Sequence, residues 1–427
     1  MRKIKSIGVI GLGYVGLPLA LQAEAKGFKV VGIEKSKHKL KALNNKQPII
    51  DDDIASKRLS DSKIEFTDDY STLSSVDAAI VCVPTPVDKN KQPDLSLVRK
   101  AAVEAAQHLK EGSSLVIEST INPGVCEEVV IPAIEKATDH IIGKTLHLAH
   151  CPERINPGDD KWHVGNINRV VGAESPKGLE LIANFYDQLI DAKVKRMGSI
   201  KEAEAVKIVE NTFRDVNIAF VNELAMSFAK LGINVNNVID GAATKPFAFM
   251  PHYPGIGVGG HCIPVDPYYL IEYARGKGFK HKFLSLARSI NESMPVYAVD
   301  ALESIFIEKA QGTLEDKKVL VLGLSYKSDV GDDRESPAYT VIDALKARKA
   351  NVTTFDPYIS STSSPDNLDV AIADKDAVIL VTKHREFLEL SPQSLAHLTA
   401  FIDGRNAFAD KRDQFFEHNV EYVGIGT

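Results

Sequence analysis

The sequence predicts an α/β protein with a parallel-sheet domain at each end and an all-helical region between them. Short apolar segments alternate with helical patterns over residues 4–197, and the same alternation returns from residue 317. That rhythm is typical of a mostly parallel sheet with helices on both faces. Between the two stretches, residues 199–231 have the pattern of one long helix. We therefore expect three domains, at residues 1–197, 198–312 and 313–427.

Each predicted strand is a short aliphatic run bounded by turn residues. The first domain is expected to contain strands at 4–10, 29–34, 76–84, 114–120, 147–155 and 193–197, with helices at 17–27, 95–110 and 176–190. The last domain is expected to contain strands at 317–327, 351–357, 376–384 and 400–406, with a helix that begins at Ser336 and Pro337.

The central helix carries start and stop signals. Ser199 is followed three residues later by Glu202, which is the spacing of a capping box at a helix N-terminus. Gly232 follows the last apolar residue and provides a C-terminal cap. Helical patterns continue to residue 310, with a break at the Pro- and Gly-rich segment 246–267.

Length, charge and hydropathy exclude several classes of protein. The chain has 427 residues, which is too long for a single hydrophobic core. Acids and bases are mixed along it with a net charge of −6, which argues against non-specific nucleic-acid binding. No apolar run reaches the ~18 residues of a membrane span, and the N-terminal segment lacks a signal-peptide cleavage site. We expect a cytoplasmic protein without membrane insertion or a nucleic-acid partner.

A glycine-rich motif predicts a dinucleotide site of the Rossmann type. Gly11, Gly13 and Gly16 form GxGxxG between a predicted strand and a predicted helix, where backbone N–H groups can face a pyrophosphate. Glu34 ends the next strand, where an acid binds the ribose hydroxyls and repels a 2′-phosphate, so NAD is favoured over NADP. Lys39 could offset part of that charge. A purely structural glycine turn is the alternative.

Two threonines follow later strands of the same predicted sheet. Thr85 comes after the strand at 76–84, and Thr120 ends the strand at 114–120. Ligands of open α/β sheets bind beyond the carboxyl ends of the strands, so both threonines are candidate cofactor contacts. The alternative for each is a simple strand-end cap.

One of the four cysteines lies in an unusual segment. Cys262 is part of GIGVGGHCIPVDP, residues 255–267, which has no helical period. Glycines beside a cysteine let the backbone approach a substrate, and a thiolate favoured by nearby positive charge is a nucleophile. Taken alone, these residues support a catalytic cysteine and a loop cysteine of no chemical role equally. The cysteines show no metal-ligand spacing, so we expect reduced thiols and no metal site.

Polar residues on the central helix favour the catalytic alternative. Lys207, Asn211 and Arg214 lie at i, i+4 and i+7, on one side of a largely apolar helix. A buried ammonium must have a partner, and a Lys with an amide suits an oxyanion. The alternative is a structural ion pair with an acid such as Glu153.

These motifs together resemble the UDP-glucose/UDP-N-acetylhexosamine 6-dehydrogenases, which oxidise a primary alcohol to an acid with two NAD. The matching segments are GLGYVG, VPTP, STI, PERI, the K-x-x-x-N-T-F-R helix, GGHCIPVDP, GLSYKSDVGDDRESP and IDGRN. The resemblance covers all three predicted domains. It implies an N-terminal NAD-binding domain, a helical dimerisation domain that carries the cysteine segment, and a C-terminal UDP-binding domain.

The resemblance also implies a role for each matching residue. The nucleophile would carry thiohemiacetal and thioester intermediates, and two donors would stabilise the oxyanions. The nucleophile would be Cys262, and the two oxyanion donors would be Lys207 and Asn211. Glu153 would be the general base and acid. Asp266 and Thr120 would orient or activate water. NAD would contact Gly11, Gly13, Val15, Gly16, Glu34, Lys39, Thr85, Thr120 and Arg334. The UDP-sugar would contact Arg154, Ile155, Lys207, Asn211, Arg214, Lys245, Gly259, Lys327 and Arg405.

The most specific expectation from the resemblance is the identity of the sugar. The cysteine motif and TKPFAFMPHYPG, residues 244–255, resemble the N-acetylhexosamine branch, and within it the UDP-N-acetylglucosamine enzymes most closely. PERINPGD also resembles enzymes described for the galacto epimer. The mannosamine-type enzymes carry His-x-Arg before the glycine segment, whereas Lys245 stands near the position of that Arg. The segment reaches the neighbouring subunit in the family, so Lys245 is expected to act in trans.

Several alternatives stay open at this stage. The substrate could be UDP-N-acetylgalactosamine, UDP-N-acetylmannosamine or UDP-glucose. A two-electron 3-hydroxyacid dehydrogenase shares the Rossmann domain and a Lys/Asn helix, but would need neither Cys262 nor a second nucleotide domain. A non-enzymatic NAD-responsive protein is a third alternative. The apolar surface of helix 199–231 predicts a homodimer or a higher homo-oligomer.

Overall fold

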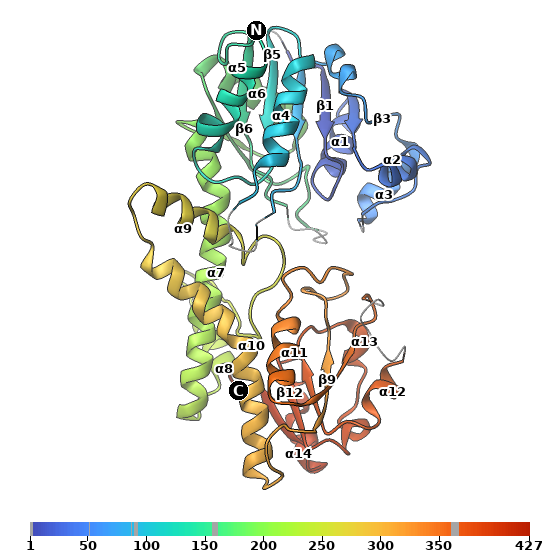
Figure 1. The fold of residues 1–427 in the computed structure, drawn as a ribbon, viewed down its shortest axis with the longest axis vertical. Helices are drawn as coiled ribbons and strands as arrows, with labels where there is room; N and C mark the ends of the chain where they lie inside the picture. The colour runs from blue at the N-terminus through green and yellow to red at the C-terminus, as the bar shows by residue number, and fades with distance from the viewer. Residues whose placement is uncertain (1–2, 51, 87, 89–92, 156–160, 360–366) are drawn as a thin grey trace. The chain divides into compact units, whose positions relative to one another are not determined.

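The computed structural model describes residues 3–50, 52–86, 88, 93–155, 161–359 and 367–427. The chain divides into two units (Figure 1). The first consists of Met1–Glu210 and Tyr268–Gly278, and the second of Asn211–Pro267 and Phe279–Thr427. The division falls inside the long central helix, so the three domain boundaries expected above stay a prediction.

The first unit is built on an eight-stranded sheet with the order β3-β2-β1-β4-β5-β6-β7-β8. Neighbouring strands are parallel except for β6 and β7, which are antiparallel. The order of the first six strands is that of dinucleotide-binding Rossmann folds. The strands are β1 (Ser6–Ile10), β2 (Lys29–Ile33), β3 (Glu65–Thr67), β4 (Ala78–Val81), β5 (Ser113–Ile117), β6 (Leu146–His150), β7 (Arg169–Ala173) and β8 (Val194–Arg196).

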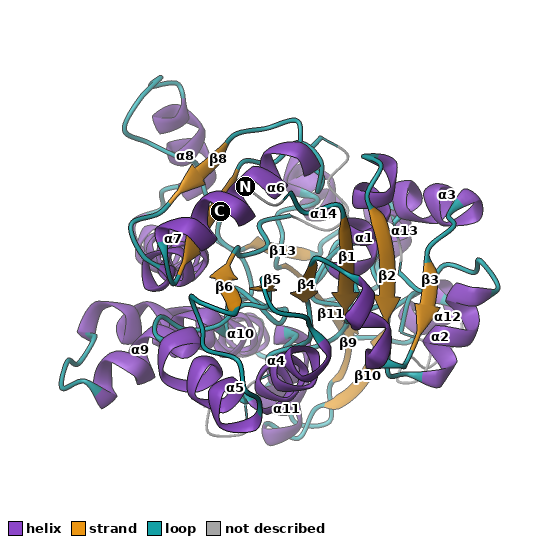
Figure 2. Ribbon diagram, turned by 90° about the horizontal axis from the view of Figure 1, so that it is seen from above, coloured by secondary structure: helices purple, strands orange, loops and turns teal. Residues whose placement is uncertain are grey.

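Helices cover both faces of this sheet (Figure 2). Ile7 and Val9 of β1 point into a core shared with α1 and α6, whereas Ile10 points into a core shared with α4 and α5. Both faces are apolar because successive strand residues alternate between two buried layers. The helices of this part are α1 (Gly16–Ala25), α2 (Lys37–Asn44), α3 (Asp53–Asp61), α4 (Ser96–His108), α5 (Ile131–Ala137) and α6 (Pro176–Leu189), with a 3₁₀ turn at Tyr70–Ser75 and a π turn at Cys126–Val130.

The central helix forms as its end signals predict. It is α7 (Ile200–Leu231). The Ser199 Oγ accepts from the backbone N–H of Glu202 at 3.1 Å, and Glu202 Oε2 accepts from the N–H of Gly198 at 2.8 Å. The helix ends where Gly232 takes a φ of 69°. Both ends are therefore determined by short-range contacts that a few neighbouring residues make.

The second unit contains a five-stranded, fully parallel sheet with the order β10-β9-β11-β12-β13. This is the other common order of doubly wound α/β domains. Val319 and Val321 of β9 face a core formed with α10, α11 and the C-terminal part of α7. The strands are β9 (Lys318–Leu322), β10 (Asn351–Phe355), β11 (Ala377–Leu380), β12 (Ala400–Asp403) and β13 (Glu421–Gly424).

The helices after α7 match the expected helical pattern up to residue 310. They are α8 (Val235–Ala243), α9 (Asp266–Gly276), α10 (Lys282–Glu308), α11 (Pro337–Ala347), α12 (Leu368–Ile372), α13 (Arg385–Leu388) and α14 (Arg412–Glu417), with 3₁₀ turns at Pro392–Leu395 and Ala409–Lys411. Ser336 caps α11 by accepting from the N–H of Ala338 at 3.3 Å. The expected α/β fold class is confirmed. Within the described residues, no helix has the length and apolar character needed to cross a bilayer.

The structure differs from the expected elements at several strands. Strands β3 and β13 were not expected, and the largest differences are at β6 and β7. The strand expected at 147–155 stops at His150, because the following residues turn and bring the Glu153 carboxylate to Arg169 of β7. Strand β7 was not expected, since its segment begins with a charged residue, Arg169. Its antiparallel pairing with β6 brings Arg169 into the interior.

Candidate active site

The turn between β1 and α1 is shaped for a dinucleotide. Gly11 has a φ of 88°, and a Cβ there would lie 2.8 Å from the carbonyl oxygen of Cys82. A Cβ at Gly16 would lie 2.0 Å from the carbonyl oxygen of Gly11, whereas one at Gly13 would meet no atom within 4 Å. The first and third glycines are thus required for strand–helix packing. The second leaves open space beside the backbone, where a pyrophosphate binds in such folds.

The groups around this turn fit NAD. Glu34 Oε2 accepts from the N–H of Leu12 at 3.2 Å, and Oε1 accepts from the N–H of Ser36 at 2.9 Å. These bonds hold the carboxylate beside the turn and leave acceptor capacity for ribose hydroxyls. Helix α1 begins at Gly16 after Val15 without a side-chain cap, so its first N–H groups can bind phosphate.

The other expected NAD contacts lie on three elements. Lys39 is exposed on α2, and Thr85 and Thr120 are half-buried beyond the ends of β4 and β5. The carbonyl oxygen of Thr85 accepts a hydrogen bond from the hydroxyl of Tyr269 at 2.5 Å. Both threonines therefore stand at the carboxyl edge of the first sheet, where a nucleotide binds in this fold. Arg334 belongs to the second unit.

Glu153 is nearly buried, with 6% of its surface exposed. Its Oε1 accepts from the backbone N–H groups of Arg154 at 2.5 Å and Ile155 at 2.7 Å, and its Oε2 accepts from Nη2 of Arg169 at 2.7 Å. An ion pair between Glu153 and Lys207 was the structural alternative in the sequence. In the described part of the chain, the ion-pair partner of Glu153 is Arg169 instead.

Arg154, an expected substrate contact, is held by side-chain and backbone oxygens. Its Nη2 lies 2.5 Å from Oε1 of Glu210 on α7, and its Nη1 donates to the carbonyl oxygen of Asn168 at 2.7 Å. Arg154 and Ile155 are half-buried. These contacts fix the turn after β6, which carries Glu153.

Helix α7 presents the three expected polar residues at helical spacing. Lys207 is half-buried, Asn211 is buried and Arg214 is exposed. Nδ2 of Asn211 donates to Oδ2 of Asp266 at 2.5 Å. Asp266 is the first residue of α9, so this bond ties the end of the cysteine segment to α7. It uses one of the two N–H donors of the amide.

Cys262 lies on an irregular segment, residues 255–265, which leads into α9. The carbonyl oxygen of Cys262 accepts from the N–H groups of Val265 at 3.0 Å and Asp266 at 2.8 Å, which closes a turn. Gly257 and Gly260 have φ values of 83° and 89°, which side chains disfavour. The glycines therefore shape the segment, and the half-buried Cys262 follows directly after them.

The cysteine segment packs on the loop after β9, residues 323–336. The N–H of Gly260 donates to the carbonyl oxygen of Arg334 at 3.1 Å. A Cβ at Gly259 would lie 2.8 Å from Cβ of Tyr326 and 2.9 Å from Cδ of Pro337. Neither atom can rotate away, because each is fixed by its own backbone. Gly259, an expected substrate contact, is therefore required for the packing of the two loops.

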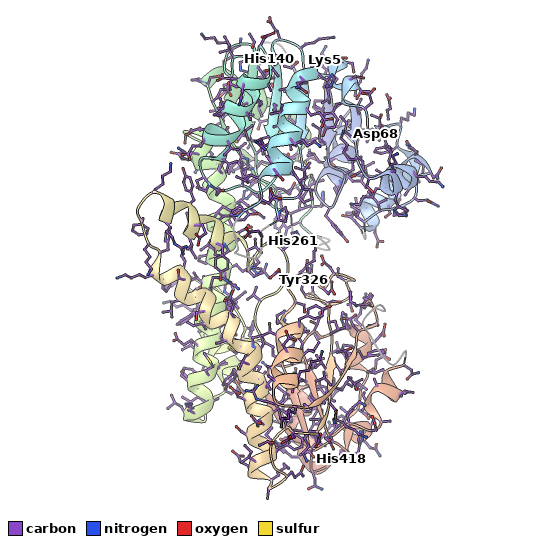
Figure 3. All side chains as sticks on the ribbon, viewed as in Figure 1. Lys5, Asp68, His140, His261, Tyr326 and His418 are labelled. Atoms are coloured by element: carbon purple, nitrogen blue, oxygen red, sulfur yellow. The ribbon has the colours of Figure 1, made fainter. Side chains whose placement is uncertain are left out.

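A positive charge lies near the sulfur of the cysteine segment. Arg334 Nη2 pairs with Oδ2 of Asp332 at 2.5 Å. The hydrogen bond to Asp332 raises the pKa of Arg334, and Cys262 adds to the rise, so the guanidinium is within electrostatic reach of the thiol. Nearby positive charge favours the thiolate. Tyr326 and His261, labelled in Figure 3, come from the two packed loops.

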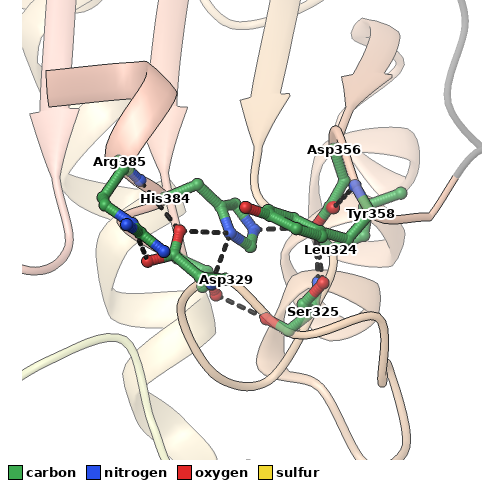
Figure 4. A network of polar contacts seen from close by, with 8 residues as sticks. Leu324, Ser325, Asp329, Asp356, Tyr358, His384 and Arg385 are labelled. Carbon is green, nitrogen blue, oxygen red and sulfur yellow. Dashed lines mark hydrogen bonds and ion pairs between the residues drawn. The ribbon is translucent and has the colours of Figure 1, made fainter. Parts of the chain in front are cut away.

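A buried polar network holds the loop after β9 in place (Figure 4). Oδ2 of Asp356 accepts from the N–H groups of Leu324 and Ser325, both at 2.7 Å, and lies 3.0 Å from Nε2 of His384. Nδ1 of His384 accepts from the N–H of Asp329 at 2.9 Å. Burial opposes ionisation of Asp356, but the hydrogen bonds from His384 and Ser325 outweigh it and hold the pKa of Asp356 well below its usual range.

Each of the two sheets has an acidic residue directly after the strand that pairs with its first strand, and the two acids have different surroundings. Glu34 follows β2, which pairs with β1, and Asp356 follows β10, which pairs with β9. Each carboxylate accepts from the residue after the first glycine of the turn, Leu12 or Leu324. Glu34 has a half-exposed carboxylate, whereas that of Asp356 is buried and bonded to His384. A ribose diol therefore fits the acid of the first unit and not that of the second.

The remaining expected UDP-sugar contacts belong to the second unit. Lys327 is half-buried on the loop after β9. Arg405 follows β12, and its Nη1 would lie 2.8 Å from a Cβ at Gly255, so the start of the cysteine segment passes close to the guanidinium. Lys245 is exposed beyond α8, with its Nζ 4.7 Å from the centroid of the Phe247 ring.

The other cysteines are poorly suited to nucleophilic chemistry. Burial and neighbouring carboxylates raise the pKa of Cys82, Cys126 and Cys151. They therefore stay neutral thiols, whereas a nucleophile must be a thiolate. Within the described residues, no group of three or more His, Cys, Asp or Glu side chains could hold a metal ion.

Buried polar residues that the sequence analysis did not single out support the cysteine segment. Oδ1 of Asn222 accepts from the N–H of Gly255 at 3.0 Å, and its Nδ2 donates to Oδ1 of Asn291 at 2.9 Å. Asn291 and Arg288 of α10 both donate to Oδ1 of Asp215, at 2.9 and 2.6 Å. Their signal in the sequence is a polar residue on the apolar face of a long helix, which must find a partner if it is buried.

Glu118, Arg169 and Tyr186 form a buried cluster with Glu153 in the first unit, which the sequence patterns did not predict. Arg169 and Tyr186 have no exposed surface, and Glu118 has 1%. A charged residue at the end of an apolar strand was the available signal. The four side chains come from the residues after β5 and β6, from β7 and from α6. These segments are far apart in the sequence, so only the tertiary structure identifies the cluster.

Three family models match the chain in order. They are the NAD binding domain, the central domain and the UDP binding domain of the UDP-glucose/GDP-mannose dehydrogenase family, at residues 5–190, 201–293 and 320–410. The expected family and the NAD cofactor are thereby confirmed. The first unit, which contains the glycine turn, includes the region matched by the NAD binding domain.

Individual relatives match over nearly the whole chain. The UDP-N-acetyl-D-glucosamine 6-dehydrogenase of Pseudomonas aeruginosa is 34% identical over 404 residues, 93% of this chain and 94% of that protein. The solved UDP-D-ManNAc dehydrogenase from Pyrococcus horikoshii is 34% identical, with a TM-score of 0.91 over 99% of both chains. The solved NDP-N-acetyl-D-galactosaminuronic acid dehydrogenase from Methanosarcina mazei Go1 is 30% identical, with a TM-score of 0.86 over 99% of this chain and 95% of that one. The chain belongs to the UDP-glucose/GDP-mannose dehydrogenase family.

Proposed function

We propose that this protein oxidises the C6 hydroxyl of a UDP-N-acetylhexosamine to a carboxylate, in two NAD-dependent steps through a thiohemiacetal and a thioester on Cys262. One observation carries the proposal. The N–H of Gly260, shortly before Cys262, donates to the carbonyl oxygen of Arg334, and Nδ2 of Asn211 donates to Asp266 on the other side of the cysteine. The other three thiols have raised pKa values and stay protonated.

The residues divide the chemistry as follows. Glu153 takes the proton of the C6 hydroxyl as the first oxidation yields an aldehyde. The thiolate of Cys262 adds to the aldehyde carbon, and the second oxidation converts this thiohemiacetal to a thioester. NAD, when bound, accepts one hydride at each oxidation. Lys207 and Asn211 donate hydrogen bonds to the oxygen that bears negative charge along this route.

Hydrolysis completes the reaction. Water adds to the thioester carbonyl, the carbon–sulfur bond breaks, and the acid leaves while Cys262 is restored. Asp266 and Thr120 orient or activate that water. The positive charges of Arg154, Arg214, Lys327 and Arg405 contact the UDP-sugar, together with Ile155 and Gly259. A diphosphate requires positively charged side chains of this kind, because the chain as a whole is acidic.

The preferred sugar in this proposal is UDP-N-acetylglucosamine. The resemblance of segment 244–255 and the Pseudomonas aeruginosa relative support it. Relatives with similar identity are named for the mannosamine and galactosaminuronic acid substrates. The UDP-N-acetylhexosamine epimers are therefore compared in the same substrate assay.

A panel of four nucleotide sugars tests the proposal. UDP-N-acetylglucosamine, UDP-N-acetylgalactosamine, UDP-N-acetylmannosamine and UDP-glucose are each incubated with NAD, and NADH is counted against sugar consumed. We expect two NADH per acid, with the highest kcat/KM for UDP-N-acetylglucosamine. Higher activity on another epimer would correct the sugar alone. One NADH per substrate would contradict the cysteine route and favour the two-electron dehydrogenase, and no NADH with any sugar would contradict the proposed function.

We further propose that the protein is a homodimer in which a second copy covers an apolar face of α7. Val209, Phe213 and Phe220 are about half exposed on that helix, at 56%, 49% and 53%. Phe213 and Phe220 line a surface hollow of about 400 Å³ with Phe249 and Met250. Apolar patches of this kind mark interaction sites. The adjoining Lys245 would then act in the partner's site.

Substitution of Phe220 with aspartate is expected to convert the protein to a monomer, because a carboxylate on the apolar face would be desolvated without a partner. Sedimentation velocity measures the change. Leu97→Asp is the matched control, since Leu97 is 43% exposed on α4 of the first unit and should leave the oligomer unchanged. A Phe220→Asp variant with the sedimentation coefficient of the unsubstituted protein would rule out this interface.

A further inference from the structure

A buried cluster of charged and polar side chains lies behind Glu153 in the first unit. Arg169 is at its centre: Nη2 lies 2.7 Å from Oε2 of Glu153, and Nη1 lies 3.5 Å from Oε2 of Glu118. On the far side, the hydroxyl of Tyr186 donates to Oε1 of Glu118 at 2.5 Å. The four side chains come from β7, the turn after β6, the end of β5 and α6. Arg169, Glu118 and Tyr186 have no role in the chemistry proposed for Glu153 and Cys262.

The contacts of Glu153 leave it one orientation. Two backbone N–H groups occupy Oε1, from Arg154 and Ile155, and the guanidinium of Arg169 occupies one side of Oε2. A carboxylate has about four lone-pair positions, so the recorded donors account for three. The fourth, on Oε2, is where a substrate hydroxyl or water can donate. Rotation of the carboxylate would break all three recorded bonds.

We propose that Arg169 is a positioning residue that fixes the Glu153 carboxylate for proton transfer. Glu118 and Tyr186 hold Arg169 in place, and the protonation state of Glu118 sets the net charge around the guanidinium. The inference rests on the proposed role of Glu153 as base and acid. Without the guanidinium, Glu118 and Glu153 would be two buried carboxylates with no shared cation. One of them would take up a proton, and Glu153 would lose the donor that aligns Oε2.

The charge of the cluster changes near neutral pH. Burial, together with the charge of Glu153, raises the pKa of Glu118 to about 7, against the opposing charge of Arg169 and the hydrogen bonds from Arg169 and Tyr186. The thiols of Cys82 and Cys151 also face this cluster, but their pKa values are raised and they stay neutral. Below this pH, Glu118 is neutral and the guanidinium pairs with Glu153 alone. Above it, two carboxylates share one guanidinium.

An Arg169→Lys variant tests the positioning role. Lysine keeps the positive charge but lacks the planar fork that reaches two carboxylates. We expect kcat to fall about 100-fold, as a misplaced catalytic group typically costs, while KM for the UDP-sugar and NAD change by less than about threefold. Arg196→Lys is the matched control, because Arg196 on β8 pairs with Glu180 and Asp187 at the surface. Equal kcat values for the two variants would overturn the proposal.

Two conservative variants are expected to change the pH profile of kcat/KM, which a purely structural role of the cluster would leave unchanged. The hydroxyl of Tyr186 lowers the pKa of Glu118, so Tyr186→Phe should move the corresponding inflection in the pH profile of kcat/KM to higher pH. Glu118→Gln keeps an acceptor for Tyr186 but cannot titrate, so the inflection should disappear. Both variants fill the original volume and decide the matter if Arg169→Lys fails to fold. Profiles unchanged in both would overturn the coupling to Glu118.

A structural measurement separates this inference from the proposed function. Crystals of the Arg169→Lys protein with NAD should show the Glu153 carboxylate rotated so that Oε2 leaves the position that it holds beside Arg169, whether or not a UDP-sugar is oxidised. An unrotated carboxylate would overturn the positioning role. If the unsubstituted protein oxidises no UDP-sugar but the rotation occurs, the proposed function fails while the clamp on Glu153 stands.

Discussion

Cys262→Ala is expected to abolish formation of the acid while NAD binding is retained. The aldehyde has no sulfur to add to in this variant, so the second oxidation has no thiohemiacetal to act on. We expect acid formation to fall by at least about 1000-fold. Mass spectrometry of the UDP-sugar products measures the acid, and titration with NAD confirms that the glycine turn between β1 and α1 is intact.

The buried Cys126 provides the matched control for this experiment. It lies in the first unit with Glu204 accepting from its N–H at 2.8 Å, and its raised pKa keeps it a thiol. Cys126→Ala should therefore form acid at close to the original rate. Acid formation by Cys262→Ala at a similar rate would rule out the covalent route. A mass shift on the Cys262 peptide, after acid quenching with substrate, would identify the thioester directly.

Asn211→Ala is expected to lower kcat by about 100- to 1000-fold, as the loss of one oxyanion donor does in other enzymes. Its amide also holds Oδ2 of Asp266 at 2.5 Å, so the variant frees the start of α9 as well. The two side chains then act as a unit. The double variant Asn211→Ala/Asp266→Ala should be less impaired than the product of the two single effects, because coupled residues are not additive.

Steady-state kinetics of the two single variants and the double variant measure this coupling. Asn237→Ala is the control, since Asn237 is an exposed amide on α8 of the same unit, and its kcat should not change. The oxyanion role would be contradicted by an Asn211→Ala variant whose kcat stays within about threefold of the original. Effects that multiply without coupling would instead show that Asn211 and Asp266 act independently.

Much of the fold could be predicted because its signals are local. The helix from Ile200 to Leu231 begins at a capping box and ends at a glycine cap. The turn at Gly11 needs a positive φ that side chains disfavour. Strand β7 was missed, because a segment that begins with Arg169 does not show the apolar run on which strand prediction depends.

The candidate site could be predicted only as a set of residue types. The sequence indicated that the ammonium group of Lys207 requires a partner, and an ion pair with Glu153 was the structural alternative. In the described part of the chain, Glu153 forms its ion pair with Arg169. The family resemblance implied that Gly259 contacts the substrate, whereas the structure also requires a glycine there because Tyr326 lies against it. The partners are 16 residues apart for Glu153 and Arg169 and 67 residues apart for Gly259 and Tyr326, so no spacing rule for helices or turns could identify them.

The amino-acid sequence by itself determined the features that neighbouring residues control: the glycine turn and its acid, the ends of the central helix, and the cysteine beside two glycines. Only the tertiary structure decided how buried charge is balanced, with Arg169 between two carboxylates and Asn211 bonded to Asp266. The physical reason is that a turn or a cap is stabilised within a few residues. A buried charge is stable only where the whole fold brings a partner to it.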